Sequence, residues 1–145
     1  MALFSSFNIN ASGMTAERLR SDIISQNLAN VNTTSTKDGG PYRRKTVVFT
    51  EKGNSSFNQV LMTTQGAVGK GVKVTKIVED TSTAMRMVYD PSHPDADENG
   101  YVTYPNVNTV TEMTNLIDAS RAYEANVTAF NASKSMAMKG LEINT

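Results

Sequence analysis

The chain has 145 residues, 14 basic and 14 acidic side chains, and no cysteine. This length fits a single domain, and the formal net charge of zero offers no global field that would attract nucleic acid, an anionic membrane or a polyanionic substrate. Without cysteine, disulfides, thiolate metal sites and a cysteine nucleophile are excluded. We therefore expect any partner to be recognised by shape and packing.

The N-terminal sequence Met-Ala-Leu-Phe-Ser-Ser lacks the basic region and long apolar run of a secretory signal, and no apolar stretch elsewhere reaches membrane-spanning length. We do not expect export by the general secretory route. Apolar residues make up 39% of the chain and tryptophan is absent, which is a thin supply of core for a compact monomer. We expect the missing burial to occur between subunits.

Near the N-terminus, apolar residues recur at steps of three and four residues, which is the pattern of an amphipathic helix. The series is Phe4, Phe7, Ala11, Met14, Ala16, Leu19, Ile23 and Leu28. Gly13 weakens this pattern, and Ser12 followed by Glu17 is typical of a helix start. We therefore predict a helix over residues 15–30, with the first ten residues forming a separate or frayed turn.

A second helical pattern covers residues 107–141, which at about 1.5 Å per residue makes a rod roughly 50 Å long. One stripe carries mostly large side chains, at Val110, Met113, Leu116, Ile117, Ser120, Tyr123, Val127, Phe130, Ala137 and Leu141. Beside it runs a stripe of small residues, at Ala119, Ala122, Ala129, Ala132 and Ser133. A helix with a large face and a small face is expected to have more than one neighbour.

Short β-like runs occupy the middle of the chain, at residues 45–50, 60–62, 72–78, 85–89 and 101–104, separated by turns rich in glycine and proline. The predicted fold class is α+β, with an N-terminal axial helix in residues 1–34, an inserted β-rich body in 35–106 and a long C-terminal axial helix in 107–145. If the ends of the body lie close together, the two helices pair as an antiparallel coiled coil.

Two helices alone cannot cover all their apolar faces, so we predict that they become ordered among copies of the chain or its relatives. An ordinary intramolecular helix pair is the alternative. The predicted subunit interface consists of Met14, Leu19, Ile23, Leu28, Val110, Met113, Leu116, Ile117, Tyr123, Val127, Phe130, Ala137 and Leu141.

Several loop motifs look like chemical sites, and we interpret each as a turn or a solvated edge. Residues 95–100 match the opening of a calcium loop, but the twelfth position is Asn106 where a glutamate is needed. His93 is the only histidine, so zinc would need three carboxylates beside it. Residues 66–71 lack the spacing of a phosphate loop, and the basic run 43–45 is expected to keep a strand edge soluble. We predict no catalytic, cofactor or metal site.

Two terminal stretches carry a resemblance to a known family: Gln26-Asn27-Leu28-Ala29-Asn30-Val31-Asn32-Thr33-Thr34 and, after Glu112, Arg121-Ala122-Tyr123-Glu124-Ala125-Asn126. They are similar to the N-terminal signature and closing helix of the flagellar axial proteins, the rod and hook family. The residues that match the family motif are Asn27, Asn30, Asn32, Thr33, Glu112, Arg121, Tyr123 and Asn126.

The middle of the chain sharpens this resemblance. The runs Gly40-Pro41-Tyr42-Arg43-Arg44-Lys45 and Tyr89-Asp90-Pro91 resemble the proximal-rod members of the family, whereas residues 51–69 match no part of it and form a variable loop. Ser35 stands where family members usually carry glycine, so we expect Gly39 and Gly40 to supply the left-handed turn.

The resemblance implies a structural subunit of the proximal rod of the bacterial flagellar basal body, not an enzyme, that assembles helically through its terminal helices to transmit motor torque. It implies a periplasmic position reached through the flagellar type III apparatus without a cleaved signal. The implied partners are copies of the chain, the rod proteins FlgB, FlgF and FlgG, the adaptor FliE and the MS-ring protein FliF, with no nucleic acid, small-molecule substrate, cofactor or membrane insertion.

Two other classes of protein remain open from the sequence. One is an independent β-rich binding or adhesion module with helical termini, and the other is a calcium-dependent or hydrolytic enzyme. An independent module should have terminal helices that are protected from hydrogen exchange in the isolated monomer, whereas such an enzyme should respond to calcium or to a substrate.

Overall fold

The computed structural model describes residues 2–37, 39–53 and 69–142. In chain order the elements are helix α1 (Ala2–Ala29), strands β1 (Lys45–Glu51), β2 (Val72–Glu79), β3 (Arg86–Tyr89) and β4 (Tyr101–Tyr104), and helix α3 (Thr109–Glu142). This order confirms the predicted α+β class, with long helices at both ends and strands between them. The β-like run predicted at residues 60–62 lies outside the described residues.

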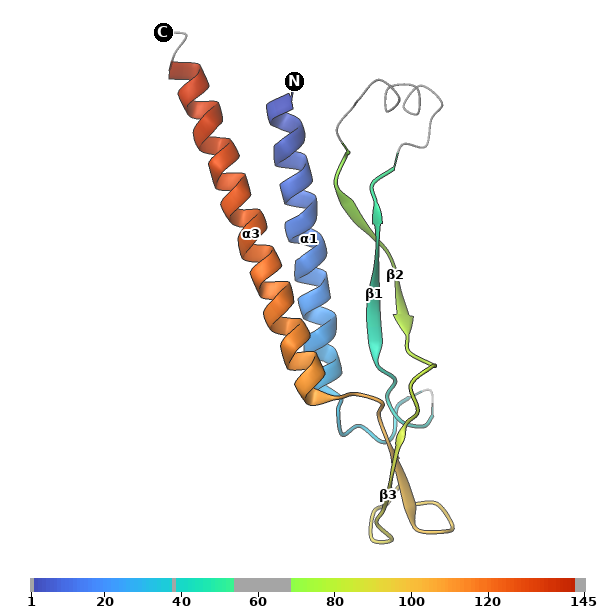
Figure 1. The fold of residues 1–145 in the computed structure, drawn as a ribbon. Coiled ribbons are helices and arrows are strands. Elements are labelled where there is room, and N and C mark those ends of the chain that lie inside the picture. The colour runs from blue at the N-terminus through green and yellow to red at the C-terminus, as the bar shows by residue number, and fades with distance from the viewer. Residues whose placement is uncertain (1, 38, 54–68, 143–145) are drawn as a thin grey trace.

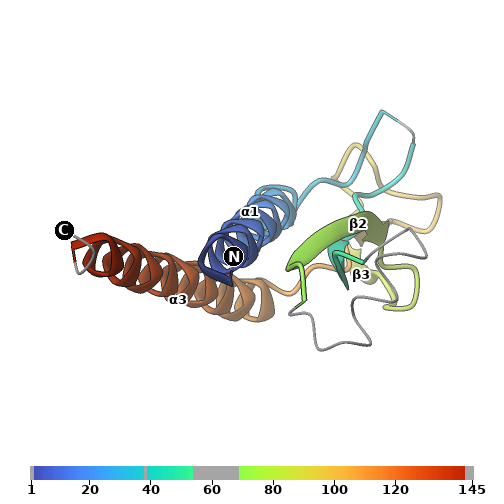
Figure 2. The same ribbon diagram turned by 90° about the horizontal axis from the view of Figure 1, so that it is seen from above.

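Helix α1 lies in the middle of the molecule. It contacts α3 on one side and the antiparallel strands β1 and β2 on another. The view along the helices shows α3, α1 and the β1–β2 pair side by side in that order (Figure 2). The two helices run antiparallel, so both chain termini lie at one end, and the β3–β4 hairpin projects at the opposite end (Figure 1). In the described part of the chain, no helix has both the length and the apolar character needed to cross a membrane.

The predicted start of the N-terminal helix is wrong, because α1 is continuous from Ala2 to Ala29. Ser12 does not cap a helix here: its hydroxyl donates to the carbonyl of Ile9 (2.7 Å) and accepts the amide of Val72, the first residue of β2 (3.1 Å). At Gly13 an added Cβ would lie 2.6 Å from Oδ1 of Asn126 on α3. The two residues that weaken the local helix pattern are therefore contact points with the neighbouring elements, and packing overrides local propensity.

The N-terminal turns of α1 are also packed. The rings of Phe7 on α1 and Phe130 on α3 meet edge to face, with centroids 5.0 Å apart, a geometry favoured by aromatic quadrupoles. This contact explains why the helix does not fray at Gly13 into a separate turn.

Helix α3 begins at an asparagine cap. Oδ1 of Asn108 accepts the amides of Val110 (3.0 Å) and Thr111 (3.2 Å), which satisfies two of the amides that every helix N-terminus leaves without a partner. Ala119 and Ser133, from the small-residue stripe, are buried, on the side that packs against α1. The other small residues predicted on that stripe differ in exposure: Ala122 is half-buried, whereas Ala129 and Ala132 are exposed.

The β-rich body consists of two antiparallel hairpins, and the described strands form no larger sheet. Strand β1 pairs with β2 from Lys45 opposite Glu79 to Glu51 opposite Val72, with a bulge between Val48 and Phe49. Strand β3 pairs with β4 over four residue pairs. The first hairpin lies along α1, and the second continues away from the helices.

The expectation for the turn before β1 is confirmed. Gly39 and Gly40 have φ angles of 85° and 78°, and no non-glycine residue in the described ranges has a positive φ. Ser35 therefore adopts an ordinary backbone conformation, and the two glycines supply the left-handed geometry that a Cβ would disfavour.

The apolar core is small. Its buried members in the described ranges are Ala16, Ile23, Ile24, Tyr42, Val102 and Ala119. Four polar residues are buried with them, namely Asn27, Asn106, Glu112 and Ser133. A core of this size leaves much of the specificity of the fold to polar contacts.

Candidate functional site

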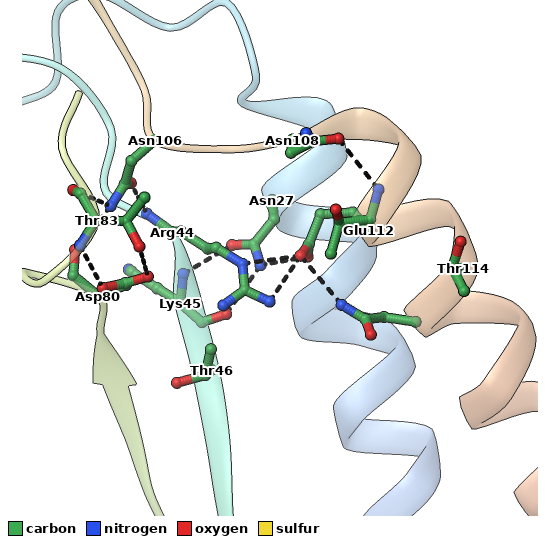
Figure 3. Close-up of polar contacts among 12 residues, drawn as sticks. Asn27, Arg44, Lys45, Thr46, Asp80, Thr83, Asn106, Asn108, Glu112 and Thr114 are labelled. Carbon is green, nitrogen blue, oxygen red and sulfur yellow. Dashed lines mark hydrogen bonds and ion pairs between the residues drawn. The ribbon is translucent and has the colours of Figure 1, made fainter. Parts of the chain in front are cut away.

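The most elaborate site in the described structure is a cluster of polar side chains where the last turns of α1, the start of β1 and the first turn of α3 converge (Figure 3). We call Asn27, Tyr42, Arg44, Asn106 and Glu112 the polar junction. Asn27 and Glu112 are both fully buried. Buried polar groups need hydrogen-bond partners, because leaving one unpaired costs about 1–3 kcal/mol.

Asn27 uses every hydrogen-bonding position of its side-chain amide. Its Nδ2 donates to the carbonyl of Lys45 and to Oε2 of Glu112, both at 2.8 Å. Its Oδ1 accepts the amide of Lys45 and the hydroxyl of Tyr42, both at 2.9 Å. The paired bonds to the main chain of Lys45 fix the first residue of β1 against the end of α1.

Glu112 connects the same point to α3. One of its oxygens, Oε2, accepts from Asn27, while Oε1 accepts from Nε of Arg44 at 2.8 Å and lies 2.8 Å from the second guanidinium nitrogen. Asn115 also donates to Oε1, at 3.4 Å. Charge-assisted bonds of this kind are shorter and stronger than neutral ones, so a buried carboxylate and a half-buried guanidinium join helix α3 to strand β1.

Asn106, in the segment between β4 and α3, connects the residue before β1 to the turn between β2 and β3. Its Oδ1 accepts the amide of Arg44 (2.9 Å), and its Nδ2 donates to the carbonyls of Asp80 (2.8 Å) and Thr83 (3.2 Å). The carboxylate of Asp80 holds the turn between β2 and β3 by accepting from the hydroxyls and amides of Ser82 and Thr83. These hydrogen bonds hold the pKa of Asp80 well below its ordinary value.

The surroundings of Tyr42 in the polar junction favour the neutral form of its phenol side chain. Burial, then the nearby carboxylates of Glu79 and Glu112, raise the pKa of Tyr42 above its ordinary value. Tyr42 thus remains a hydrogen-bond donor to Asn27 across the physiological range.

The basic run at 43–45 behaves differently from its predicted role as a soluble strand edge. Arg43 is exposed, but Arg44 is half-buried and forms the ion pair with Glu112 described above. Lys45 lies within 4.0 Å of Glu79 on β2 and 5.7 Å from the ring centroid of Tyr42. Two of the three charges therefore hold elements together.

The residues of the predicted family motif separate into groups. Asn27 and Glu112 meet in the junction, 85 positions apart in sequence. Thr33 donates to Asn30 (3.1 Å) in the turn after α1, and Asn126 lies against Gly13. Asn32, Arg121 and Tyr123 are exposed. The family motif therefore includes residues that make contacts within the subunit and residues that are exposed on its surface.

Residues of the predicted interface on α1 are mostly half-buried within the subunit: Met14, Leu19 and Leu28 are partly covered, and Ile23 is buried. On α3, Leu116, Val127, Phe130 and Ala137 are likewise half-buried. The remaining large residues on α3 are between 40% and 74% exposed, at Val110, Met113, Ile117, Tyr123 and Leu141, together with Met136 and Met138.

The loop motifs that resemble a calcium loop and a zinc site form turns. Oδ1 of Asp97 accepts the amides of Asn99 (2.9 Å) and Tyr101 (2.8 Å), and Nδ1 of His93 accepts the amide of Asp95 (3.1 Å). Within the described ranges, no group of three His, Asp or Glu side chains is arranged to hold a metal ion. Residues 66–68 of the loop that resembles a phosphate site lie outside the described residues, and residues 69–71 lead into β2.

Comparison with known proteins identifies the family. A model described as "Flagella basal body rod protein" matches residues 7–35, and one described as "Flagellar basal body rod FlgEFG protein C-terminal" matches residues 98–143. The chain is 50% identical to the flagellar basal-body rod protein FlgC of Bacillus subtilis, covering 99% of each chain. The chain belongs to the FlgC family of flagellar basal-body rod proteins.

Two further FlgC relatives span nearly the full chain. The protein of Borreliella burgdorferi is 47% identical and that of Escherichia coli 41% identical, each match covering 99% of this chain and 98% of the relative. The assignment to the FlgC family confirms the prediction of a structural subunit of the flagellar rod and not an enzyme. As a FlgC-family subunit, the chain assembles with other components of the basal body.

Proposed function

We propose that this FlgC-family subunit packs into the rod through the outward face of α3 and carries torque through the polar junction. The packing is supported by a difference in exposure between the two sides of α3. Its side toward α1 is occupied within the subunit, whereas seven large apolar residues on the rest of its surface are at least 40% exposed. Exposed apolar patches of this kind mark interaction surfaces.

Six of these seven exposed residues fall into two clusters, and Tyr123 lies alone between them. Val110, Met113 and Ile117, spaced by three and four residues, lie on one side of the first turns of α3. Met136, Met138 and Leu141 lie near its end, and apart from Tyr123 the exposed residues between the two clusters are polar or small. Because complete burial of one such side chain contributes roughly 1.5–3 kcal/mol, a few of them per subunit are enough to order helices that are only partly packed alone.

The polar junction supplies the stiffness that torque transmission requires. It joins α1, α3 and β1 by charge-assisted and amide hydrogen bonds in place of a broad apolar core. A rotation of the hairpin against the helices would break several of these directional bonds at once, whereas apolar contacts can slide. We infer that the junction fixes the angle between the hairpins and the helix pair.

We infer the neighbours and location from membership of the FlgC family. The proposed neighbours are further copies of the chain, the rod proteins FlgB, FlgF and FlgG, the adaptor FliE and the MS-ring protein FliF. The proposed position is the periplasmic part of the proximal rod, reached through the flagellar type III system. The domain boundaries proposed for this role remain residues 1–34, 35–106 and 107–145.

The substitution Ile117→Asp tests the packing proposal. Burying an unpaired carboxylate between helices is costly, so we expect the variant subunit to be produced and exported but not incorporated, and the cells not to swim. The measurements are the subunit content of purified basal bodies and of the external fraction, together with spreading in soft agar.

Thr128→Asp is the matched control. Thr128 is exposed and lies eleven residues further on, about three turns along the same side of the helix, in the polar stretch. We expect this variant to assemble. Normal rods from cells that carry Ile117→Asp would contradict the proposed packing.

A further inference from the structure

Charge is distributed unevenly along a chain whose total is zero. Residues 37–79, which include the β1–β2 hairpin, contain eight Lys and Arg but only three Asp and Glu. Residues 80–106, which include the β3–β4 hairpin, contain one Arg and five Asp and Glu. The two hairpins therefore carry opposite charge, and surfaces of opposite charge attract each other across an interface.

The two faces of the β3–β4 hairpin differ in exposure on β4, whereas every residue of β3 is exposed. Its inner face carries Val102, which is fully buried, and Arg86, which lies 5.1 Å from the ring centroid of Tyr104. Its outer face carries Met87 and Tyr89, 61% and 64% exposed.

Tyr101 completes this outer face. It lies opposite Tyr89 in the ladder, and the two rings meet edge to face at 5.3 Å. The acidic turn with Asp97 and Glu98 precedes Tyr101 and is separated from it by Asn99 and Gly100. We call Met87, Tyr89, Tyr101 and Glu98 the hairpin patch. It is an aromatic surface with an acidic edge, and none of its apolar side chains is needed to fill the subunit's own core.

A groove of complementary character lies between α1 and the first half of β2. Its volume is about 530 Å³, and apolar residues including Leu19, Val72 and Val74 line it. Arg18, Lys52 and Lys73 also line it, against a single acidic residue, Asp22. We call this the basic groove.

The hairpin patch and the basic groove lie toward opposite ends of the molecule. β2 begins toward the end where the chain termini lie, and the β3–β4 hairpin projects at the other end (Figure 1). Two different surfaces at opposite ends make a heterologous contact, which repeats from copy to copy as a helical stack instead of closing as a twofold dimer.

We propose that the hairpin patch of one subunit docks in the basic groove of a second copy of this chain. The proposal rests on the proposed role as an assembling rod subunit and adds a contact that does not involve the outward face of α3. The aromatic rings would cover the apolar lining of the groove, and Glu98 would face its basic residues. The occupant is a second copy of the chain for two reasons. The hairpin patch and the basic groove are complementary in charge, and every copy of the chain carries both surfaces.

A charge exchange tests this contact. Glu98→Lys and Lys73→Glu each place like charges across the proposed interface, and both positions are exposed, so neither change disturbs the subunit's own core. We expect each single variant to reduce swimming and the rod content of purified basal bodies several-fold. We expect the double variant Glu98→Lys/Lys73→Glu to recover most of the loss, since opposite charges then face each other again.

Lys37→Glu is the control, since it makes the same change of charge as Lys73→Glu at an exposed position outside the groove. We expect it to swim normally. The contact is refuted if both single variants swim normally, or if the double variant is as impaired as the worse single variant.

Cysteine crosslinking identifies the occupant, because the natural chain contains no cysteine. In isolated basal bodies, mild oxidation of a Glu98→Cys/Lys73→Cys variant should produce a ladder of multiples of the chain mass, which neither single-cysteine variant produces. Monomer alone, or a product that contains another protein, would overturn the proposal. Basal bodies that contain rods but give no ladder would reject this contact while leaving packing through α3 intact.

Discussion

Asn27 is the residue on which the polar junction depends most, because an amide both donates and accepts. Its two donated bonds go to Glu112 and the carbonyl of Lys45, and its two accepted bonds come from Tyr42 and the amide of Lys45. A carboxylate has the same shape as this amide but cannot donate when ionised. The requirement at position 27 is therefore chemical and not only steric.

The substitution Asn27→Asp should be strongly destabilising at neutral pH. It would place a second carboxylate against the buried Glu112 and remove two donated bonds, which we expect to lower the free energy of unfolding by about 3 kcal/mol or more. Asn30→Asp is the control, since the Asn30 side chain donates to the Gln26 carbonyl at an exposed site (2.9 Å) and should cost about 1 kcal/mol or less. Urea unfolding followed by circular dichroism measures both, and equal losses would contradict the special role of Asn27.

Tyr42 makes the junction sensitive to alkaline pH. Its pKa is raised in the folded chain, so the stability that the neutral phenol contributes is complete below the unfolded value of about 10 and is lost as the pH rises through the folded value. We expect the unfolding free energy of the natural chain to fall more steeply above about pH 10 than that of Tyr42→Phe. Tyr89→Phe, at an exposed tyrosine, is the control, and parallel curves for Tyr42→Phe and the natural chain would contradict the assignment.

At the scale of the elements, hydrophobic periodicity located both helices, and β-like runs bounded by turn residues located the four described strands. The start of α1 could not be found in this way, because Ser12 and Gly13 imitate a helix start while their actual partners, Val72 and Asn126, lie far along the chain. The junction was missed for a similar reason. Asn27 and Glu112 were noticed as motif residues, but no local pattern indicates that they touch, or that Arg44 would be drawn inward to meet them.

Gly13 is the element-scale position that can be tested most directly. Alanine favours a helix over glycine by about 1 kcal/mol, but at position 13 its Cβ would collide with the amide of Asn126, which itself donates to the carbonyl of Ala122 (2.8 Å). We expect Gly13→Ala to lower the melting temperature and the double variant Gly13→Ala/Asn126→Ala to restore it. Circular dichroism melting measures both effects.

Gly140→Ala is the matched control for this pair, because an added Cβ at Gly140 meets no atom within 4 Å. It should leave the melting temperature unchanged or raise it. If Gly13→Ala alone stabilised the subunit as much as Gly140→Ala, the close approach of α1 and α3 at this point would not constrain the sequence.

At the scale of the whole molecule, order should decrease with distance from the junction. The junction joins three elements, whereas residues 134–142 at the end of α3 are all exposed except half-buried Ala137. In the isolated subunit we expect amide hydrogen exchange to be slowest around the start of β1 and the first turns of α3, and fastest in residues 134–142. Uniform protection along α3 would instead indicate a subunit that is complete without neighbours.

The fully buried Glu112 has one more consequence, which concerns how the subunit reaches its place. A buried ion pair contributes little net stability compared with apolar packing, but it is satisfied in only one geometry. We therefore expect a small core closed by such a pair to resist unfolding only weakly and to refold to a single conformation. We propose that the chain passes unfolded through a narrow export channel and refolds at the growing tip of the rod. The combination would lower the free energy needed to unfold the chain for export and would leave the assembled subunit in one defined conformation.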